Sequence, residues 1–92
     1  MKHATPATLR LIDALLVEVR RRPELRERTP GAFYFKAKGY LHFHEDPAGI
    51  FADVKLDHAE FTRMRVSTAA EQRKLIEAMD RSLKAAARSV AR

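Results

Sequence analysis

His42 and His44 are the residues of this sequence whose type and spacing best suit chemistry. Residues two apart on an extended strand point to the same side, so both imidazoles would lie about 7 Å apart on one sheet face. Asp53 falls on the next predicted strand, where its carboxylate would complete or orient a site. A metal ion requires three or four ligands. A small-ligand or metal site on these three residues is therefore kept as an alternative, and we assign no metal ligand and no cofactor.

The same residues also allow a catalytic arrangement. Asp53 would orient His42 as a general base, with Tyr34 or a water molecule as the proton partner. The sequence contains no nucleophile elbow, glycine-rich phosphate loop or acidic metal cluster beside them, and no cysteine for thiolate zinc sites or disulfides. A row of surface polar residues explains the pattern more simply. The sequence therefore favours a binding module over an enzyme.

Three stretches with alternating apolar and polar residues predict the strands that carry these side chains, at residues 33–36, 40–44 and 51–56. Ala37-Lys38-Gly39 suits a three-residue hairpin turn, and Asp46-Pro47-Ala48-Gly49 has the layout of a type I turn. Turn length sets the strand register and places every apolar residue on one face. The predicted cross-strand pairs are Phe33–Phe43, Phe35–Leu41, Phe43–Ala52 and Leu41–Val54.

Amphipathic helices are predicted on both sides of the strands. Thr5-Pro6 provides an N-cap hydroxyl and a proline at the first helical position, and the helical pattern continues to about Arg22. Pro23 interrupts it and is compatible with a further turn anchored by Leu25. Residues 62–67 are compatible with a fourth strand, and Thr68 begins a capping box for the second helix. The apolar stripe of that helix is Leu75, Met79, Leu83, Ala86 and Val90.

The order of helix, three or four antiparallel strands and helix predicts one α+β domain over residues 1–92. Both helices must bury an apolar stripe, so we expect two layers with both helices on the same sheet face. The longest apolar run, residues 14–17, is far shorter than the ~20 residues that span a bilayer. The N-terminus lacks the layout of a signal peptide. We therefore expect a cytosolic protein with no membrane segment.

The sheet face opposite the helices is predicted to be open. Its main cross-strand row is Tyr34, His42, Asp53 and Arg65, and the neighbouring row is Lys36, Tyr40, Lys55 and Arg63. Exposed aromatic side chains on a small domain favour an interaction surface, so we predict a homodimer through this face, anchored by Tyr34, Tyr40 and Phe51. The predicted ligand-binding residues are Tyr34, Tyr40, His42, His44, Phe51, Asp53 and Arg65.

Basic residues concentrate at the two ends of the chain. The formal net charge is +6, and it is carried by residues 1–30 and 68–92, whereas residues 31–67 are neutral. Nucleic-acid binding through the basic helix ends is a weaker alternative, because charge runs usually mark solvated helix ends and no RNP-like or KH-like motif is present. The residues for this alternative are Arg20, Arg21, Arg22, Arg26 and Arg28.

One stretch carries a resemblance. Residues 40–49, with the sequence YLHFHEDPAG, and residues 52–54 resemble a block found in small uncharacterised bacterial proteins. The resemblance covers only part of the chain. It implies a similar small α+β fold and no assigned activity, so it transfers no catalytic residue.

Overall fold

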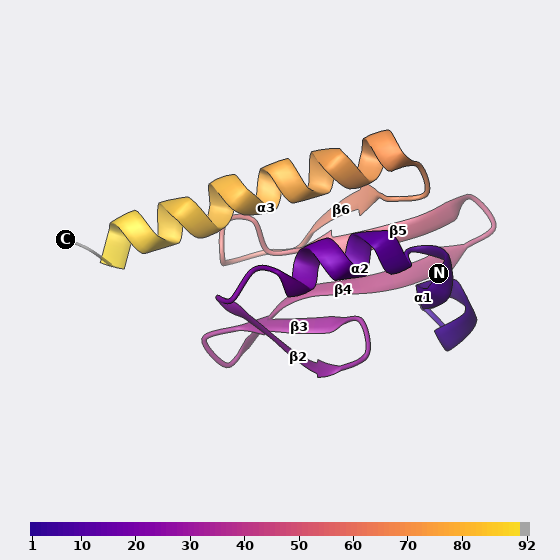
Figure 1. The fold of residues 1–92 in the computed structure, drawn as a ribbon, viewed down its shortest axis with the longest axis horizontal. Coiled ribbons are helices and arrows are strands. Elements are labelled where there is room, and N and C mark those ends of the chain that lie inside the picture. The colour runs from indigo at the N-terminus through magenta and orange to yellow at the C-terminus, as the bar shows by residue number, and fades with distance from the viewer. Residues whose placement is uncertain (91–92) are drawn as a thin grey trace.

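The computed structural model describes the backbone of residues 1–90 and the side chains of residues 1–88. It has an α+β fold in which helices pack on an antiparallel sheet (Figure 1). The elements are β1 (Lys2–His3), α1 (Pro6–Leu11), α2 (Asp13–Arg20), β2 (Leu25–Thr29), β3 (Ala32–Phe35), β4 (Lys38–Asp46), β5 (Gly49–Val54), β6 (Thr62–Arg65) and α3 (Ala69–Val90).

The sheet follows the order of the chain from β2 to β6, and every pair of neighbours is antiparallel. Strand β4 is the longest, with nine residues. Its first half pairs with β3, and β1 pairs with Glu45 and His44 further along. Since β5 occupies the other side of β4, β1 continues the sheet edge where β3 ends.

A single apolar core lies between one sheet face and helices α2 and α3, which run over the sheet (Figure 1). Each layer contributes side chains that are almost fully buried, such as Val19 from α2, Leu41 from β4 and Met79 from α3. This confirms the prediction that both amphipathic helices cover the same face. The predicted stripe of α3 is buried from Leu75 to Leu83, and the side chain of Val90 lies outside the described residues.

The first predicted hairpin has the wrong register. Phe33 lies opposite Leu41, not Phe43, and Phe35 lies opposite Lys38, not Leu41. The turn is the two-residue loop Lys36-Ala37, in which both residues have positive φ, as a type I′ hairpin requires. The glycine at position 39 suggested a longer loop, but it belongs to the strand.

Tyr40 is placed in the core by an irregularity in this hairpin. The pairing shifts between Phe33–Leu41 and Tyr34–Gly39, which leaves Tyr40 as an extra residue in β4. A β-bulge of this kind re-aims a side chain relative to strict alternation. Tyr40 is therefore buried on the helix side, with 1% of its surface exposed, and not on the open face as predicted.

The β4–β5 hairpin has the predicted register, with Leu41 opposite Val54 and Phe43 opposite Ala52. The predicted fourth strand is also present as β6. The capping box of α3 forms as expected, because Glu71 N–H donates to Thr68 Oγ1 at 3.1 Å and Thr68 N–H donates to Glu71 Oε1 at 3.0 Å.

The first helix and the segment after it differ from prediction. A break at Ile12, with φ −112° and ψ 27°, divides the predicted helix into α1 and α2. The break leaves Leu11 77% exposed. Residues 25–29 form the edge strand β2 and not a turn anchored by Leu25. This strand has one apolar residue in its sequence LRERT, so hydrophobic alternation cannot reveal it.

Candidate functional site

The open sheet face carries a cluster of histidines around one carboxylate. As predicted, His42 lies opposite Asp53 in the β4–β5 pair, and His44 lies opposite Phe51. His42 Nε2 is 3.5 Å from Asp53 Oδ2, and His44 Nδ1 is 3.2 Å from the same oxygen. One nitrogen or oxygen ligand atom from each of these three residues lies within 4.8 Å of the others.

Asp53 is held in place by Arg63 from β6. The guanidinium donates from Nε to Oδ1 at 2.8 Å and from Nη2 to Oδ2 at 2.9 Å, which is a bidentate pair. The sequence predicted Arg65 for this row, but the β5–β6 register places Arg63 opposite Asp53 and Arg65 opposite Phe51. Arg65 instead binds Ala48 O and the Glu71 carboxylate.

His3 is a third histidine of the cluster, and the sequence analysis missed it. It lies opposite His44 in the β1–β4 pair, with ring centroids 4.6 Å apart, and its ring is 6.0 Å from that of His42. Two contacts fix the segment that follows: Ala4 N–H donates to Phe43 O and Thr5 N–H donates to Glu45 Oε1. A two-residue strand has no periodicity, so no sequence signal of this kind could have identified it.

The electrostatics of the cluster favour neutral imidazoles beside a charged carboxylate. Burial lowers the pKa of His42 and of His44, and it outweighs the attraction of Asp53 for the protonated form. The hydrogen bonds from Arg63 lower the pKa of Asp53 and outweigh its own burial. In the part of the chain that the structure describes, His44 Nδ1 is buried and has no hydrogen-bond partner, despite its short distance to Asp53.

Of the three aromatic residues predicted to anchor this face, Phe51 lies beside the histidine cluster, whereas Tyr34 and Tyr40 do not lie in the predicted positions. Tyr34 lies opposite Arg26 and Gly39, not in the row of His42, and its ring lies 4.7 Å from the Arg28 guanidinium carbon. Phe51 is half-buried beside His44. Tyr40 is absent from this face. Phe61, which the sequence analysis did not select, is 43% exposed and packs edge-on against His42 at 4.8 Å.

Three of the five arginines predicted to bind nucleic acid are paired with carboxylates. Arg20 binds Glu27, Arg21 binds Glu18 and Arg22 binds Asp80. Arg28 covers Tyr34, and Arg26 is exposed on β2. Ion pairing reduces the cationic field that this segment offers to phosphates, so nucleic-acid binding stays a prediction that the fold does not favour.

Comparisons of this chain with protein-family models, with curated proteins and with solved structures gave no match. Evidence for a function therefore comes from the geometry of the open face. Among the described residues, no helix is both long enough and apolar enough to cross a membrane.

Proposed function

We propose that the protein is a small binding module whose open sheet face binds a divalent transition-metal ion through His42, His44 and Asp53, with His3 as a fourth ligand. The observation that carries the proposal is the position of His44 Nδ1, a buried nitrogen without a hydrogen-bond partner among the described residues, 3.2 Å from a carboxylate oxygen of Asp53. A buried polar atom without a partner costs free energy unless a ligand satisfies it.

The distances within the cluster support this proposal. A tetrahedral ion with nitrogen and oxygen ligands at about 2.0–2.1 Å holds neighbouring ligand atoms about 3.3–3.4 Å apart. The nitrogens of His42 and His44 lie 3.5 and 3.2 Å from Asp53 Oδ2, close to that spacing. The sheet sets these positions, because the three residues come from paired positions of β4 and β5.

The donor set determines which ions fit. Imidazole nitrogens suit zinc, copper and nickel, whereas magnesium and calcium prefer sites made of oxygen ligands. The imidazoles must be neutral to bind, and the lowered pKa values of His42 and His44 favour that form for these two ligands. Arg63 would act as the outer partner that orients the ligating carboxylate.

The number of ligands favours binding over catalysis. Catalytic zinc sites usually have three protein ligands and an open position, whereas structural sites have four. The ligand atoms within 4.8 Å of one another come from His42, His44 and Asp53. His3 lies outside that group, with its ring centroid 4.6 Å from that of His44, so it would become the fourth ligand by a change of its side-chain rotamer. We therefore propose that the ion fastens the N-terminal strand β1 to β4.

Zinc titration into the untagged protein by isothermal calorimetry tests the proposal. We expect one zinc per chain and a loss of at least about tenfold in affinity for His42→Ala, since loss of an outer-shell partner alone costs that much. The matched control is His58→Asn, because His58 is outside the cluster and asparagine tolerates its φ of 60°. Absence of zinc binding in the wild type would overturn the proposal, as would an equal loss in the control.

Self-association through the same face stays a separate prediction. Its remaining anchors are Tyr34 and Phe51, with Phe61 as the most exposed aromatic side chain beside them. Light scattering at high protein concentration, with and without zinc, tests it. A monomer under both conditions excludes the dimer and leaves the metal site untouched.

A further inference from the structure

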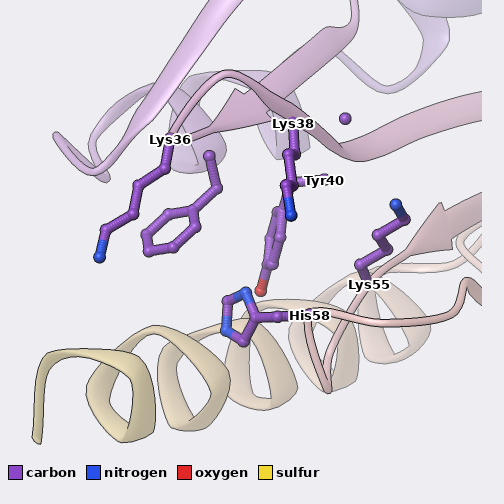
Figure 2. A pocket seen from close by; sticks show the side chains of 7 residues that line it. Lys36, Lys38, Tyr40, Lys55 and His58 are labelled. Atoms are coloured by element: carbon purple, nitrogen blue, oxygen red, sulfur yellow. The ribbon is translucent and has the colours of Figure 1, made fainter. Parts of the chain in front are cut away.

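A cavity of about 200 Å³ lies between the β3–β4 hairpin and the segment that follows β5 (Figure 2). None of its lining residues belongs to the histidine cluster. Three lysines and three ring-bearing side chains dominate the lining, and a glycine completes it. The lining residues are Phe35, Lys36, Lys38, Gly39, Tyr40, Lys55 and His58.

The charge around this cavity is unbalanced. No acidic residue lines it, and within the described part of the chain Lys36, Lys38 and Lys55 form no ion pair. Two of the ammonium groups lie over aromatic rings instead, Lys36 Nζ at 5.4 Å from Phe35 and Lys55 Nζ at 4.9 Å from Phe61. Three like charges around one cavity repel each other, so an anion placed among them would relieve that repulsion.

The inner wall of the cavity is aromatic and fixed. The ring centroids of Phe35, Tyr40 and His58 lie 5.0–6.1 Å from one another. Tyr40 donates from its hydroxyl to Ser82 Oγ at 2.9 Å, and Ser82 Oγ donates to Leu56 O at 2.7 Å. His58 Nε2 lies 3.3 Å from the same serine oxygen. The helix α3 therefore holds two of the rings in place through one buried hydroxyl.

Residues with left-handed backbone lie in and beside the lining of the cavity. Among the described residues, the non-glycine residues with positive φ are Lys36, Ala37 and His58. Two of them line the cavity, and Ala37 lies between two of its lysines. The type I′ turn requires the positive φ of Lys36 and Ala37, whereas at His58 the left-handed backbone of a residue with a Cβ costs free energy, and such residues cluster at functional sites. Lys36 and His58 both line the cavity, from opposite sides of it (Figure 2).

We propose that this cavity binds a monocyclic aromatic anion, a ring that carries one carboxylate or phosphate group. The lysines at the rim bind the anionic group, and the rings of Phe35 and His58, which keep accessible surface, contact the aromatic ring of the ligand. The volume is below the ~300 Å³ at which pockets for larger ligands begin, which fits a single ring.

Titrations of the isotopically labelled protein, followed by backbone amide NMR shifts, test the proposal. The probes are phenyl phosphate, benzoate, inorganic phosphate and benzyl alcohol. We expect phenyl phosphate or benzoate to shift the amides of Gly39 and His58, and to bind at least about fivefold more tightly than inorganic phosphate or benzyl alcohol. Equal binding of inorganic phosphate would overturn the role of the rings. Equal binding of benzyl alcohol would overturn the role of the lysines, and absence of shifts would overturn the site.

Two lysine variants and a control variant test which lysines bind the anionic group. Lys38→Gln and Lys55→Gln each remove one charge and should weaken the aromatic anion about three- to tenfold, the scale of a partly exposed charge-assisted hydrogen bond. Lys74→Gln is the matched control, because Lys74 is an exposed lysine on α3 outside the cavity. Thermal unfolding confirms that each variant is folded. An equal effect of the control would show nonspecific charge attraction and overturn the proposal.

The two proposed sites are separable. His58→Asn should weaken the aromatic anion and leave zinc binding unchanged, whereas His42→Ala should do the reverse. Loss of both activities in either variant would contradict the assignment of two separate sites.

Discussion

His3 and His44 face each other across the β1–β4 pair, with ring centroids 4.6 Å apart and a tilt of 31° between the ring planes. The pair joins the N-terminal strand to the centre of the sheet, at a position where β3 has already ended. His3 thereby adds a third imidazole to the cluster of His42, His44 and Asp53. The cluster on the open face therefore depends on a strand of only two residues.

This relationship predicts that His3 contributes to metal affinity. His3→Ala should weaken zinc binding at least about tenfold without abolishing it, because His42, His44 and Asp53 remain. Lys2→Ala is the control on the same strand, since among the described residues the one ion pair of the exposed Lys2 side chain is with Glu45, at 3.7 Å. Calorimetry measures both. Unchanged affinity in the His3 variant would remove it from the ligand set.

The β4–β5 hairpin shows what sequence could predict about the site. Asp46-Pro47-Ala48-Gly49 has clear turn chemistry, and Asp46 Oδ2 accepts a hydrogen bond from Ala48 N–H at 2.9 Å. The correct turn gave the correct register, and with it the pairing of His42 with Asp53. The candidate site was predictable to the extent that it lies on this hairpin.

The features that the sequence did not reveal depend on the backbone conformation of one turn and on contacts between residues far apart in the sequence. The two-residue turn at Lys36-Ala37 has residues that do not signal a type I′ turn, so the position of the bulge at Tyr40 was not predictable. The burial of Tyr40 depends on Ser82, which is 42 positions away in the sequence. Local patterns cannot show such a pairing. The same holds for Arg63, whose partner follows from the β5–β6 register.

The Tyr40–Ser82 hydrogen bond predicts an order of stability for two variants. Tyr40→Phe leaves the Ser82 bond to Leu56 O intact and should lower the free energy of unfolding by about 1 kcal/mol. Ser82→Ala removes the partner of both the Tyr40 hydroxyl and Leu56 O, so it should cost more, about 1–3 kcal/mol. Urea denaturation measures both. The reverse order would contradict the role of Ser82 as the shared partner.

Arg22, which follows the C-terminal end of α2, forms a bidentate ion pair with Asp80 of α3. Arg22 donates to Asp80 from Nε and Nη2, both at 2.9 Å, and from Nη1 to Glu18 O at 2.7 Å. A lysine cannot reproduce this geometry, so Arg22→Lys should lower the free energy of unfolding by about 0.5–1.5 kcal/mol. Arg21→Lys is the matched control, because its pair with Glu18 is exposed and contributes about 0–0.5 kcal/mol. Similar losses in both variants would show that the geometry at Arg22 has no special role.

The last prediction concerns pH and the edge strand β2. Glu27 accepts hydrogen bonds from Arg20 Nε at 2.7 Å and from Gly31 N–H at 2.9 Å. The Arg20 hydrogen bond is the larger cause that lowers the pKa of Glu27, and the Gly31 amide adds to it. Because the folded-state pKa lies below the unfolded value of about 4.3, the stabilisation is complete well above pH 4.3. It decreases as the pH falls through the folded-state pKa, where both states become protonated.

Glu27→Gln should therefore unfold at a lower temperature than the wild type at pH 7, and the difference should shrink as the pH is lowered below 4. Thermal unfolding between pH 7 and pH 2.5 measures it. Glu24→Gln is the control, because Glu24 is exposed and forms no ion pair within the described residues. A difference between wild type and Glu27→Gln that is constant across this range would show that the carboxylate charge does not stabilise β2.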